Sequence, residues 1–133
     1  MADRSQALHQ IVYISRSLIG GWGPDLLDIG RASLSRNAEL GLTGALFFDG
    51  DRFAQVLEGP FGAASLLMER IRRDARHFDV RILRDAPVRQ RRFAAWSMRF
   101  VDRSQAPDMA SLLARERPGP ALGHEVADRL ADV

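Results

Sequence analysis

The alternation of apolar and polar residues predicts strands and helices in turn along most of the chain. The β-branched and aromatic run LHQIVYIS at residues 8–15 predicts a first strand. A loop is expected at residues 20–24. Pro24 followed by Asp25 suits a helix start, and apolar residues at helical spacing continue this helix through Leu40.

A hairpin, a second helix and two further strands follow. The hairpin is predicted over residues 42–59, because Asp49-Gly50 is a dipeptide that accommodates a tight turn well. Helical spacing then extends over residues 61–77. The last strands are predicted at residues 79–88 and 91–101. The order βαββαββ is that of a ferredoxin-like α+β sandwich, a mixed sheet with both helices on one face.

The end of the chain has a different pattern. It predicts a short helix, a Pro-Gly-Pro break and a second helix, on which Val126, Leu130 and Val133 lie at i, i+4 and i+7. Such an apolar stripe must be covered, either by the open face of the sheet or by another subunit. We therefore expect one domain at residues 1–105 and a C-terminal helical extension at residues 106–133.

Composition limits the classes of function. A chain of 133 residues with 46% hydrophobic and 27% charged residues fits one ordinary globular domain. All 19 basic residues are Arg, but they are interleaved with 17 acidic residues, and the net charge is only +2. This balance does not favour nucleic-acid binding, and the densest basic cluster, RQRRF at residues 89–93, is interpreted as a solvated strand end.

Several kinds of site and location are not expected. The absence of cysteine excludes disulfides, thiolate nucleophiles and cysteine metal sites, and three scattered histidines make no metal pattern. No segment approaches the roughly 20 apolar residues that span a bilayer. The N-terminus lacks the apolar core of a signal peptide. We expect no metal, no membrane insertion and a cytoplasmic location.

The amide of Gln55 is the first candidate for chemistry, because it stands among apolar residues in the predicted strand. In an extended chain Gln55 shares a face with Phe53 and Leu57. A buried polar group without partners costs about 1–3 kcal/mol, so Gln55 must be exposed, bonded by protein groups or facing a polar ligand. In a ferredoxin-like order Tyr13 can be its neighbour on the helix-covered face. The two residues form either a satisfied core pair or part of a site.

Both predicted long helices carry a polar stripe. The stripe on the first helix recurs every four residues and contains Ile29, Ser33 and Asn37. The stripe on the second helix presents a cation, a carboxylate and an imidazole at i, i+4 and i+7, namely Arg70, Asp74 and His77. Taken alone, the first two of these are a surface ion pair worth less than about 1 kcal/mol. Together the stripes suit a ligand that is aromatic in the middle and anionic at its tail.

Five segments in order resemble the BLUF family of flavin-binding blue-light sensors over residues 8–102: IVYISRS, RNAELGLTGALFF, FAQVLEGP, RIRRDARH and FAAWSM. The resemblance implies a flavin held non-covalently between the two helices, with Tyr13, Asn37 and Gln55 at its ring edge. FAD is the expected flavin, and FMN and riboflavin are the alternatives.

The resemblance also implies a role for each residue of the two stripes. Asn37 would bond the C4 carbonyl and N3 side, Ile29 would pack on the ring, and Ser33 would lie beside the pocket. Arg70 would approach the ribityl or phosphate tail, while Asp74 and His77 would bond the outer pyrimidine edge. One position departs from the pattern, since many members have a second Asn where this chain has Arg36.

The implied activity is a photochemical switch. Electron transfer from Tyr13 to the excited flavin, with proton movement through Gln55, would leave Gln55 rotated or tautomerised. An amide has a donor end and an acceptor end, so it can adopt two satisfied arrangements. Trp96 and Met98, on the last predicted strand, are the expected relay to the C-terminal helices.

Two other classes of function compete with this hypothesis. A flavin-binding enzyme is disfavoured, because the chain shows no nucleophile with a matched base and no nicotinamide-binding fingerprint. A light-insensitive oligomerisation scaffold would be expected to lack Tyr13 or Gln55, and both are present. We therefore expect a non-enzymatic sensor that forms a homo-oligomer and signals to a separate protein.

Overall fold

The computed structural model describes residues 6–20, 23–114 and 119–133. Its strands form one sheet in the order β4-β1-β3-β2-β5. They are β1 (Leu8–Ser17), β2 (Thr43–Phe48), β3 (Arg52–Pro60), β4 (His77–Pro87) and β5 (Arg99–Val101). The helices are α1 (Pro24–Leu40), α2 (Phe61–Arg72), α3 (Met109–Leu113) and α4 (Pro120–Ala131). Only β5 pairs in parallel, with β2, so the sheet is mixed and the predicted ferredoxin-like sandwich is confirmed.

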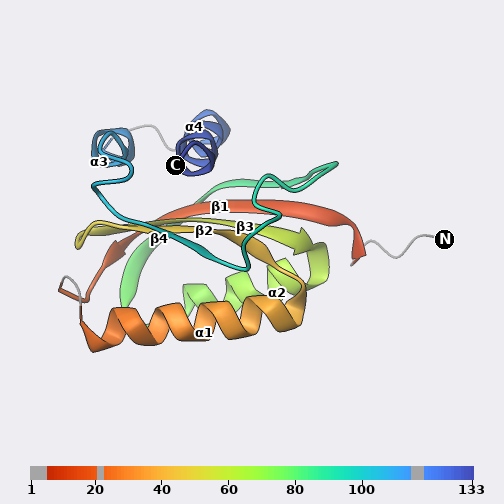
Figure 1. Ribbon diagram of the computed structural model, residues 1–133, viewed down its shortest axis with the longest axis horizontal. Coiled ribbons are helices and arrows are strands. Elements are labelled where there is room, and N and C mark those ends of the chain that lie inside the picture. Colours follow the sequence, from red (N-terminus) through yellow and green to blue (C-terminus); the bar gives the residue numbers. More distant parts are fainter. Residues whose placement is uncertain (1–5, 21–22, 115–118) are drawn as a thin grey trace.

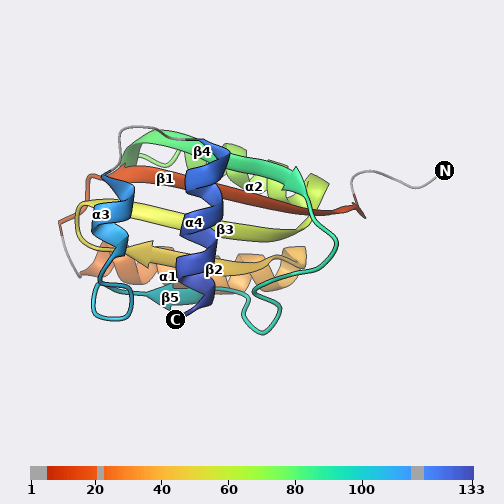
Figure 2. The ribbon, with the colours of Figure 1, turned by 90° about the horizontal axis from the view of Figure 1, so that it is seen from above.

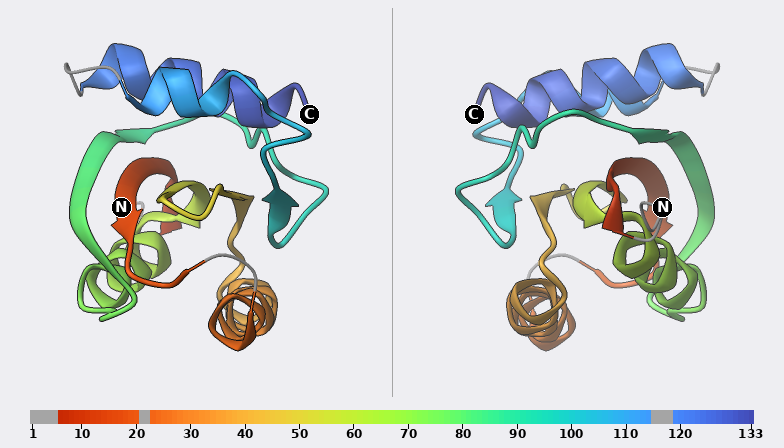
Figure 3. Two further views of the ribbon diagram at one scale, coloured as in Figure 1. Left: turned by 90° about the vertical axis from the view of Figure 1, so that its left-hand side faces the viewer. Right: turned by 90° about the vertical axis from the view of Figure 1, so that its right-hand side faces the viewer.

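The sheet is covered on both faces. Helices α1 and α2 lie on one face, and α3 and α4 lie on the other (Figure 1). Seen from above, α4 crosses the strands (Figure 2), and the end views in Figure 3 show the same three layers. Consistent with this arrangement, β3 is buried along its whole interior, from Phe53 to Gly59.

The alternation of β3 sorts its side chains between the two faces. Phe53 and Leu57 belong to the apolar cluster beneath α1 and α2, whereas Ala54 and Val56 belong to the cluster beneath the C-terminal helices. Strand β1 pairs with β3 in the middle of the sheet, and Tyr13 lies opposite Gln55. The predicted proximity of these two residues is therefore confirmed.

The hairpin between β2 and β3 turns one residue later than predicted. Asp49 donates its backbone N–H to the carbonyl of Arg52 at 3.3 Å, which makes Gly50 and Asp51 the central residues. The Asp49 carboxylate accepts hydrogen bonds from the N–H groups of Asp51 and Arg52 at 2.9 and 2.8 Å. Gly50 has φ of 95°, which glycine adopts at little cost. The prediction placed Asp inside the turn, but its side chain closes the turn from the first position.

Helix α2 is shorter than predicted. It ends at Arg72, so Asp74 lies in a turn and His77 begins β4. The Asp74 carboxylate accepts the backbone N–H of Arg76 at 3.0 Å, and this local bond competes with continuation of the helix. The expected stripe of Arg70, Asp74 and His77 on one helix face is therefore wrong.

The predicted last strand is also wrong over most of its length. Only Arg99–Val101 form β5, and residues 91–98 are irregular. The backbone N–H groups of Arg92 and Phe93 donate to the carboxylate of Glu58, each at 2.9 Å, so they are not available to a sheet ladder. Without strand alternation Trp96 and Met98 do not share a face: Trp96 is 39% exposed and Met98 only 4%.

The basic cluster at residues 89–93 is not simply solvated. The Arg91 guanidinium donates to Thr43 Oγ1 at 3.0 Å and to the carbonyl of Gly41 at 2.7 Å. Arg92 forms an ion pair with Asp128 of α4 at 2.5 Å. These arginines connect the irregular segment to the start of β2 and to α4.

The C-terminal helices cover the open face of the sheet. Val126 and Leu130 are fully buried in the cluster that contains Val12, Phe47 and Val56, and Val133 packs against it. The sequence left two possible partners for the apolar stripe of the last helix, the open face of the sheet and another subunit. The structure shows the sheet. Residues 1–5, Gly21 and Trp22 of the expected loop, and Pro118 of the expected break lie outside the described residues.

Candidate functional site

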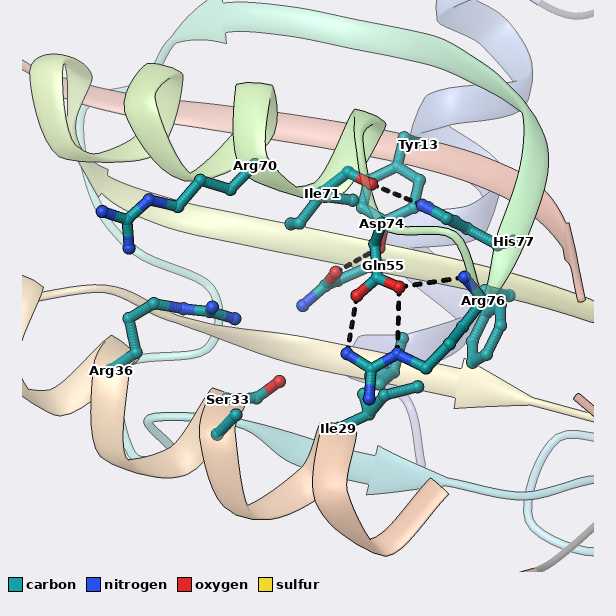
Figure 4. A pocket seen from close by; sticks show the side chains of 13 residues that line it. Tyr13, Ile29, Ser33, Arg36, Gln55, Arg70, Ile71, Asp74, Arg76 and His77 are labelled. Carbon is teal, nitrogen blue, oxygen red and sulfur yellow. Dashed lines mark hydrogen bonds and ion pairs between the residues drawn. The ribbon is translucent and has the colours of Figure 1, made fainter. Parts of the chain in front are cut away.

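A pocket of about 90 Å³ lies between α1 and α2 (Figure 4). Seven of the residues proposed from the sequence line it, namely Tyr13, Ile29, Ser33, Gln55, Arg70, Asp74 and His77. Asn37, Trp96 and Met98 are not among its lining residues. Sequence reasoning missed Arg76 and Ile71, and it noted Arg36 only as a departure from a family pattern.

The hydrogen bond between Tyr13 and Gln55 lies in the interior of this site. The Tyr13 hydroxyl donates to Gln55 Oε1, and each of the two residues is only 4% exposed. At the other end of the amide, Nε2 donates to the sulfur of Met98 at 3.7 Å. A thioether is a weak acceptor, so the two ends of Gln55 are held unequally.

The environment keeps Tyr13 protonated. Burial raises the pKa of Tyr13 well above its usual value, and the charge of Asp74 raises it further. The ring of His77 packs edge-on near that of Tyr13, with centroids 6.4 Å apart. At neutral pH the Tyr13 hydroxyl is therefore a donor, and Gln55 Oε1 is its acceptor.

One end of the pocket is closed by an ion pair. Arg76 donates to the Asp74 carboxylate through Nε at 2.9 Å and Nη2 at 2.6 Å, and through Nη1 to Asp28 of α1 at 3.0 Å. The hydrogen bond from Arg76 is the main cause of a lowered pKa at Asp74. Arg76 thus links the start of β4 to α1 across the pocket.

His77 reaches the pocket from the first position of β4. Its Nδ1 lies 2.7 Å from Ser15 Oγ, and its Nε2 lies 2.5 Å from the carbonyl oxygen of Ile71. Asp74 and His77 therefore meet in the pocket as expected, although they arrive from a turn and a strand rather than from one helix.

Two buried polar atoms on α1 lack a hydrogen-bond partner among the described residues: Arg36 Nε and Asn37 Oδ1. Asn37 is fully buried, and its Nδ2 donates to the carbonyl of Ser97 at 2.9 Å. Burial, followed by the nearby charge of Arg70, lowers the pKa of Arg36. An unpaired buried polar atom costs about 1–3 kcal/mol. Arg36 lines the pocket, so its Nε suits a polar ligand there, whereas Asn37 lies outside the lining.

Cationic groups gather at the other end of the pocket. Figure 4 shows Arg36 of α1 and Arg70 of α2 on facing sides of this end. The side chain of Arg70 makes no ion pair with any residue that the structure describes. An aromatic ring between the helices and an anionic group at this end would both find complementary chemistry.

The volume of the pocket sets a condition on such a ligand. Pockets that enclose drug-sized molecules measure roughly 300–1,000 Å³, whereas this one measures about 90 Å³. Arg36, Arg70 and Arg76 border the pocket with long side chains, and a larger ligand would require these side chains to rotate outward. The donor set fits a flavin, and we expect these guanidinium groups to move when it binds.

Comparison with known proteins identifies the class to which this site belongs. A model of the BLUF family, described as sensors of blue-light using FAD, matches residues 8–99. The chain belongs to this family, and it is a flavin-binding blue-light sensor of the BLUF type. The resemblance noted in the sequence is confirmed.

Two solved structures are similar to this chain, one over nearly the whole of its own length and the other over only part of its own length. The dark-state structure of the BLUF protein BlrB is 35% identical and has a TM-score of 0.84, covering 96% of this chain and 98% of BlrB. BlrP1 of Klebsiella pneumoniae, with FMN and cyclic diGMP, is 33% identical with a TM-score of 0.66, and the match covers 90% of this chain and 29% of BlrP1.

The curated relatives are much longer than this chain. The photoactivated adenylate cyclase subunit beta of Euglena longa is 37% identical over 98 residues, which are 73% of this chain and 11% of that protein. Within the described residues, no helix has the length and apolar character needed to cross a membrane. No group of three or more His, Cys, Asp or Glu side chains in the same residues is arranged to hold a metal ion.

Proposed function

We propose that Tyr13 and Gln55 form the photochemical switch of this sensor, with FAD as its flavin. The observation that carries the proposal is the hydrogen bond from the Tyr13 hydroxyl to an amide whose other end rests on Met98. When bound, the flavin supplies an electron acceptor that blue light excites. Asn37, Arg36 and Ser33 on one side, and Arg70, Asp74 and His77 on the other, would hold it, while Ile29 would pack on its ring.

The proposed switch depends on a proton at a defined atom. A phenol that loses an electron becomes a far stronger acid, so the Tyr13 proton would pass to Gln55 Oε1, to which it already points. With Oε1 protonated, Gln55 has a donor at each end. Its bonds to Tyr13 and Met98 would then change together. Return of the electron and the proton to Tyr13 would leave the amide rotated, whereas loss of an Nε2 proton in place of the Oε1 proton would leave it in the tautomeric form.

We further propose that Met98 responds to this change in the hydrogen bonds of Gln55 and passes it on. Met98 is buried in contact with Gln55, while Ser97 beside it accepts a hydrogen bond from Asn37. Trp96 would take part in the relay through its backbone carbonyl, which accepts the N–H of Gly44 at 3.2 Å. Its indole is partly exposed, with the Arg99 guanidinium 4.5 Å above the ring, so a direct contact with Gln55 is not part of the proposal.

The output would leave through the C-terminal extension. Under this proposal residues 1–105 are the sensor and residues 106–133 the output element, since the Arg92–Asp128 ion pair joins the segment at residues 91–98 to α4. The sensor would act in the cytoplasm as a homo-oligomer on a separate effector protein. It would have no enzymatic activity of its own, because the role of its family is sensing.

The absorption spectrum before and after blue light tests the photochemical proposal. We expect a yellow protein that releases oxidised flavin on denaturation and shows a small, reversible red shift under illumination. Gln55→Leu and Tyr13→Phe should still bind flavin, since most of the ligand's contacts lie on other residues, but neither should show the shift. A shift of wild-type size in Gln55→Leu would reduce the amide to a satisfied core group, and a colourless protein that takes up no added flavin would refute the proposal altogether.

A further inference from the structure

A second hollow lies on the outer side of α1, where this helix meets β5 at the edge of the sheet. The hollow is a groove of about 350 Å³. Figure 3 shows α1 and β5 side by side at this edge. Leu27, Leu34 and Phe100 line the groove and are all exposed. They form an apolar surface that the chain itself leaves uncovered.

The groove depends on Gly30 in the middle of α1. A Cβ added at Gly30 would meet the ring of Phe100 at 3.5 Å, so the ring lies directly against the glycine. Glycine in a helix interior costs about 1 kcal/mol relative to alanine. Here it leaves room between the helix and β5, and Leu27 and Leu34 stand on either side of this opening along α1.

One charge borders the groove. Arg31 is the only charged side chain among the described residues that line it. Arg31 makes no ion pair with any residue in the described part of the chain. The surface thus presents apolar side chains at helical spacing next to an unpaired cation.

We propose that this groove binds an amphipathic helix of a separate effector protein, one that carries apolar side chains and at least one carboxylate to pair with Arg31. Helices that bind in grooves place apolar anchors at i, i+3, i+4 and i+7, and complementary charge at the rim gives specificity. A second copy of this chain fits less well. In a two-fold dimer the same patch faces itself, which would place two copies of Arg31 in one interface whose groove lining, among the described residues, offers no carboxylate to pair with them.

The size of the patch favours the same occupant. A stable interface of standard size buries about 800 Å² on each partner. Three exposed apolar side chains around one groove offer a smaller, elongated contact that suits a single helix better than a flat protein surface.

The floor of the groove is shared with the flavin pocket. Leu46 lines both, and it lies opposite Gln55 on β3 and in register with Phe100 on β5. A change in the bonds of Gln55 therefore acts on a residue that supports the groove. The docking itself stands on the groove alone, whereas its control by light rests on the proposed function.

The docking is tested by selection from a phage library of random peptides. The peptides have about 14 residues, which is long enough for a helix. The library is selected against the flavin-loaded protein, and the affinity of each enriched peptide is measured by fluorescence anisotropy. We expect enriched peptides with leucine-like residues at helical spacing and with Asp or Glu. Their affinity should fall at least about tenfold in Leu34→Asp, and Arg31→Glu should reverse the preference to peptides with Lys. Leu66→Asp, a change at another exposed leucine, on α2, is the matched control and should have no effect.

Several results would overturn the proposal. These are the absence of any enriched peptide, enriched peptides that bind Leu34→Asp as well as the wild type, and an unchanged charge preference in Arg31→Glu. If Leu34→Asp instead halves the mass measured by light scattering, the groove is a contact between copies of this chain. The absorption shift of the same samples is recorded under blue light. A missing shift would refute the photochemical switch and leave the docking result standing, whereas a normal shift with equal dark and light affinities would refute only the coupling.

Discussion

At the scale of single residues, the proposed switch pair is fixed by the register of two neighbouring strands. Tyr13 and Gln55 are opposed across β1 and β3, and directly opposed side chains on one face are close enough to bond. A slip of one residue in either strand would send the side chain of that strand, Tyr13 or Gln55, to the other face, beneath the C-terminal helices, and separate the pair. The apolar neighbours on both faces of β3 prevent this slip, because each face of the strand is buried in its own cluster.

Tyr13 is the only tyrosine in the chain, so its ionisation is directly measurable. Burial raises its pKa in the folded protein above the unfolded value of about 10. The resulting contribution to stability is constant below that pH and decreases as pH rises above it. We predict that the tyrosinate absorbance appears late and together with loss of helical circular dichroism. In denaturant the same group should titrate near 10, and a tyrosinate signal near 10 in a fully folded protein would contradict the prediction.

Part of the site was predictable from residue types and part was not. Tyr13, Gln55 and the polar face of α1 follow from alternation and helical spacing, which depend only on local backbone geometry. Arg76 was missed, because its pairing with Asp74 and Asp28 exists only where the chain leaves α2 and returns beside α1. Spacing along one element carries no information about such a contact between elements.

At the scale of elements, a buried carboxylate prevents the segment at residues 91–98 from forming the strand that its alternating pattern predicts. Glu58 is fully buried and points to the face opposite Gln55, where Gln10 Nε2 donates to it at 2.9 Å. Its carboxylate also accepts the backbone N–H groups of Arg92 and Phe93, as described above. The alternating apolar residues of this segment suggested a strand, but the donors that a ladder needs are taken by a residue more than 30 positions away.

Glu58→Gln tests the importance of this anchor. The substitution keeps the size but replaces one acceptor oxygen by an NH₂ donor that would face other donors. Hydrogen bonds to charged groups contribute about 1.5–3 kcal/mol, and we expect the free energy of unfolding to fall by roughly 2 kcal/mol. Chemical denaturation measures the change, with Glu69→Gln on the exposed surface of α2 as the matched control. Equal stability of the two variants would show that the anchor contributes little.

At the scale of the whole molecule, one sheet separates two layers with different roles. The layer of α1 and α2 contains the proposed flavin pocket, and the layer of α3 and α4 shields the opposite face. The sequence indicated that the apolar stripe on the last helix must be covered, but it did not decide between the open face of the sheet and another subunit. The choice could not be made from periodicity, because a stripe looks the same whether it meets its own sheet or another subunit.

The cover can be tested by comparing removal of the whole layer with removal of one side chain. Truncation after residue 105 would expose the apolar face formed by Val12, Phe47 and Val56, and a large apolar patch of this kind promotes association. We expect the truncated chain to form larger assemblies than the full chain in light scattering, or to precipitate. Leu130→Ala in the full chain should leave the assembly unchanged.

The single substitution should act only on stability. Leu130 is fully buried, so its truncation to alanine should lower the free energy of unfolding by about 2–5 kcal/mol. Leu66→Ala, at a leucine that is 59% exposed on α2, should change it by less than about 0.5 kcal/mol. If the truncated chain remained as soluble as the full chain and kept its assembly state, the C-terminal layer would be dispensable as a cover. If Leu130→Ala and Leu66→Ala were equally mild, α4 would be docked too loosely to receive a signal through the Arg92–Asp128 ion pair.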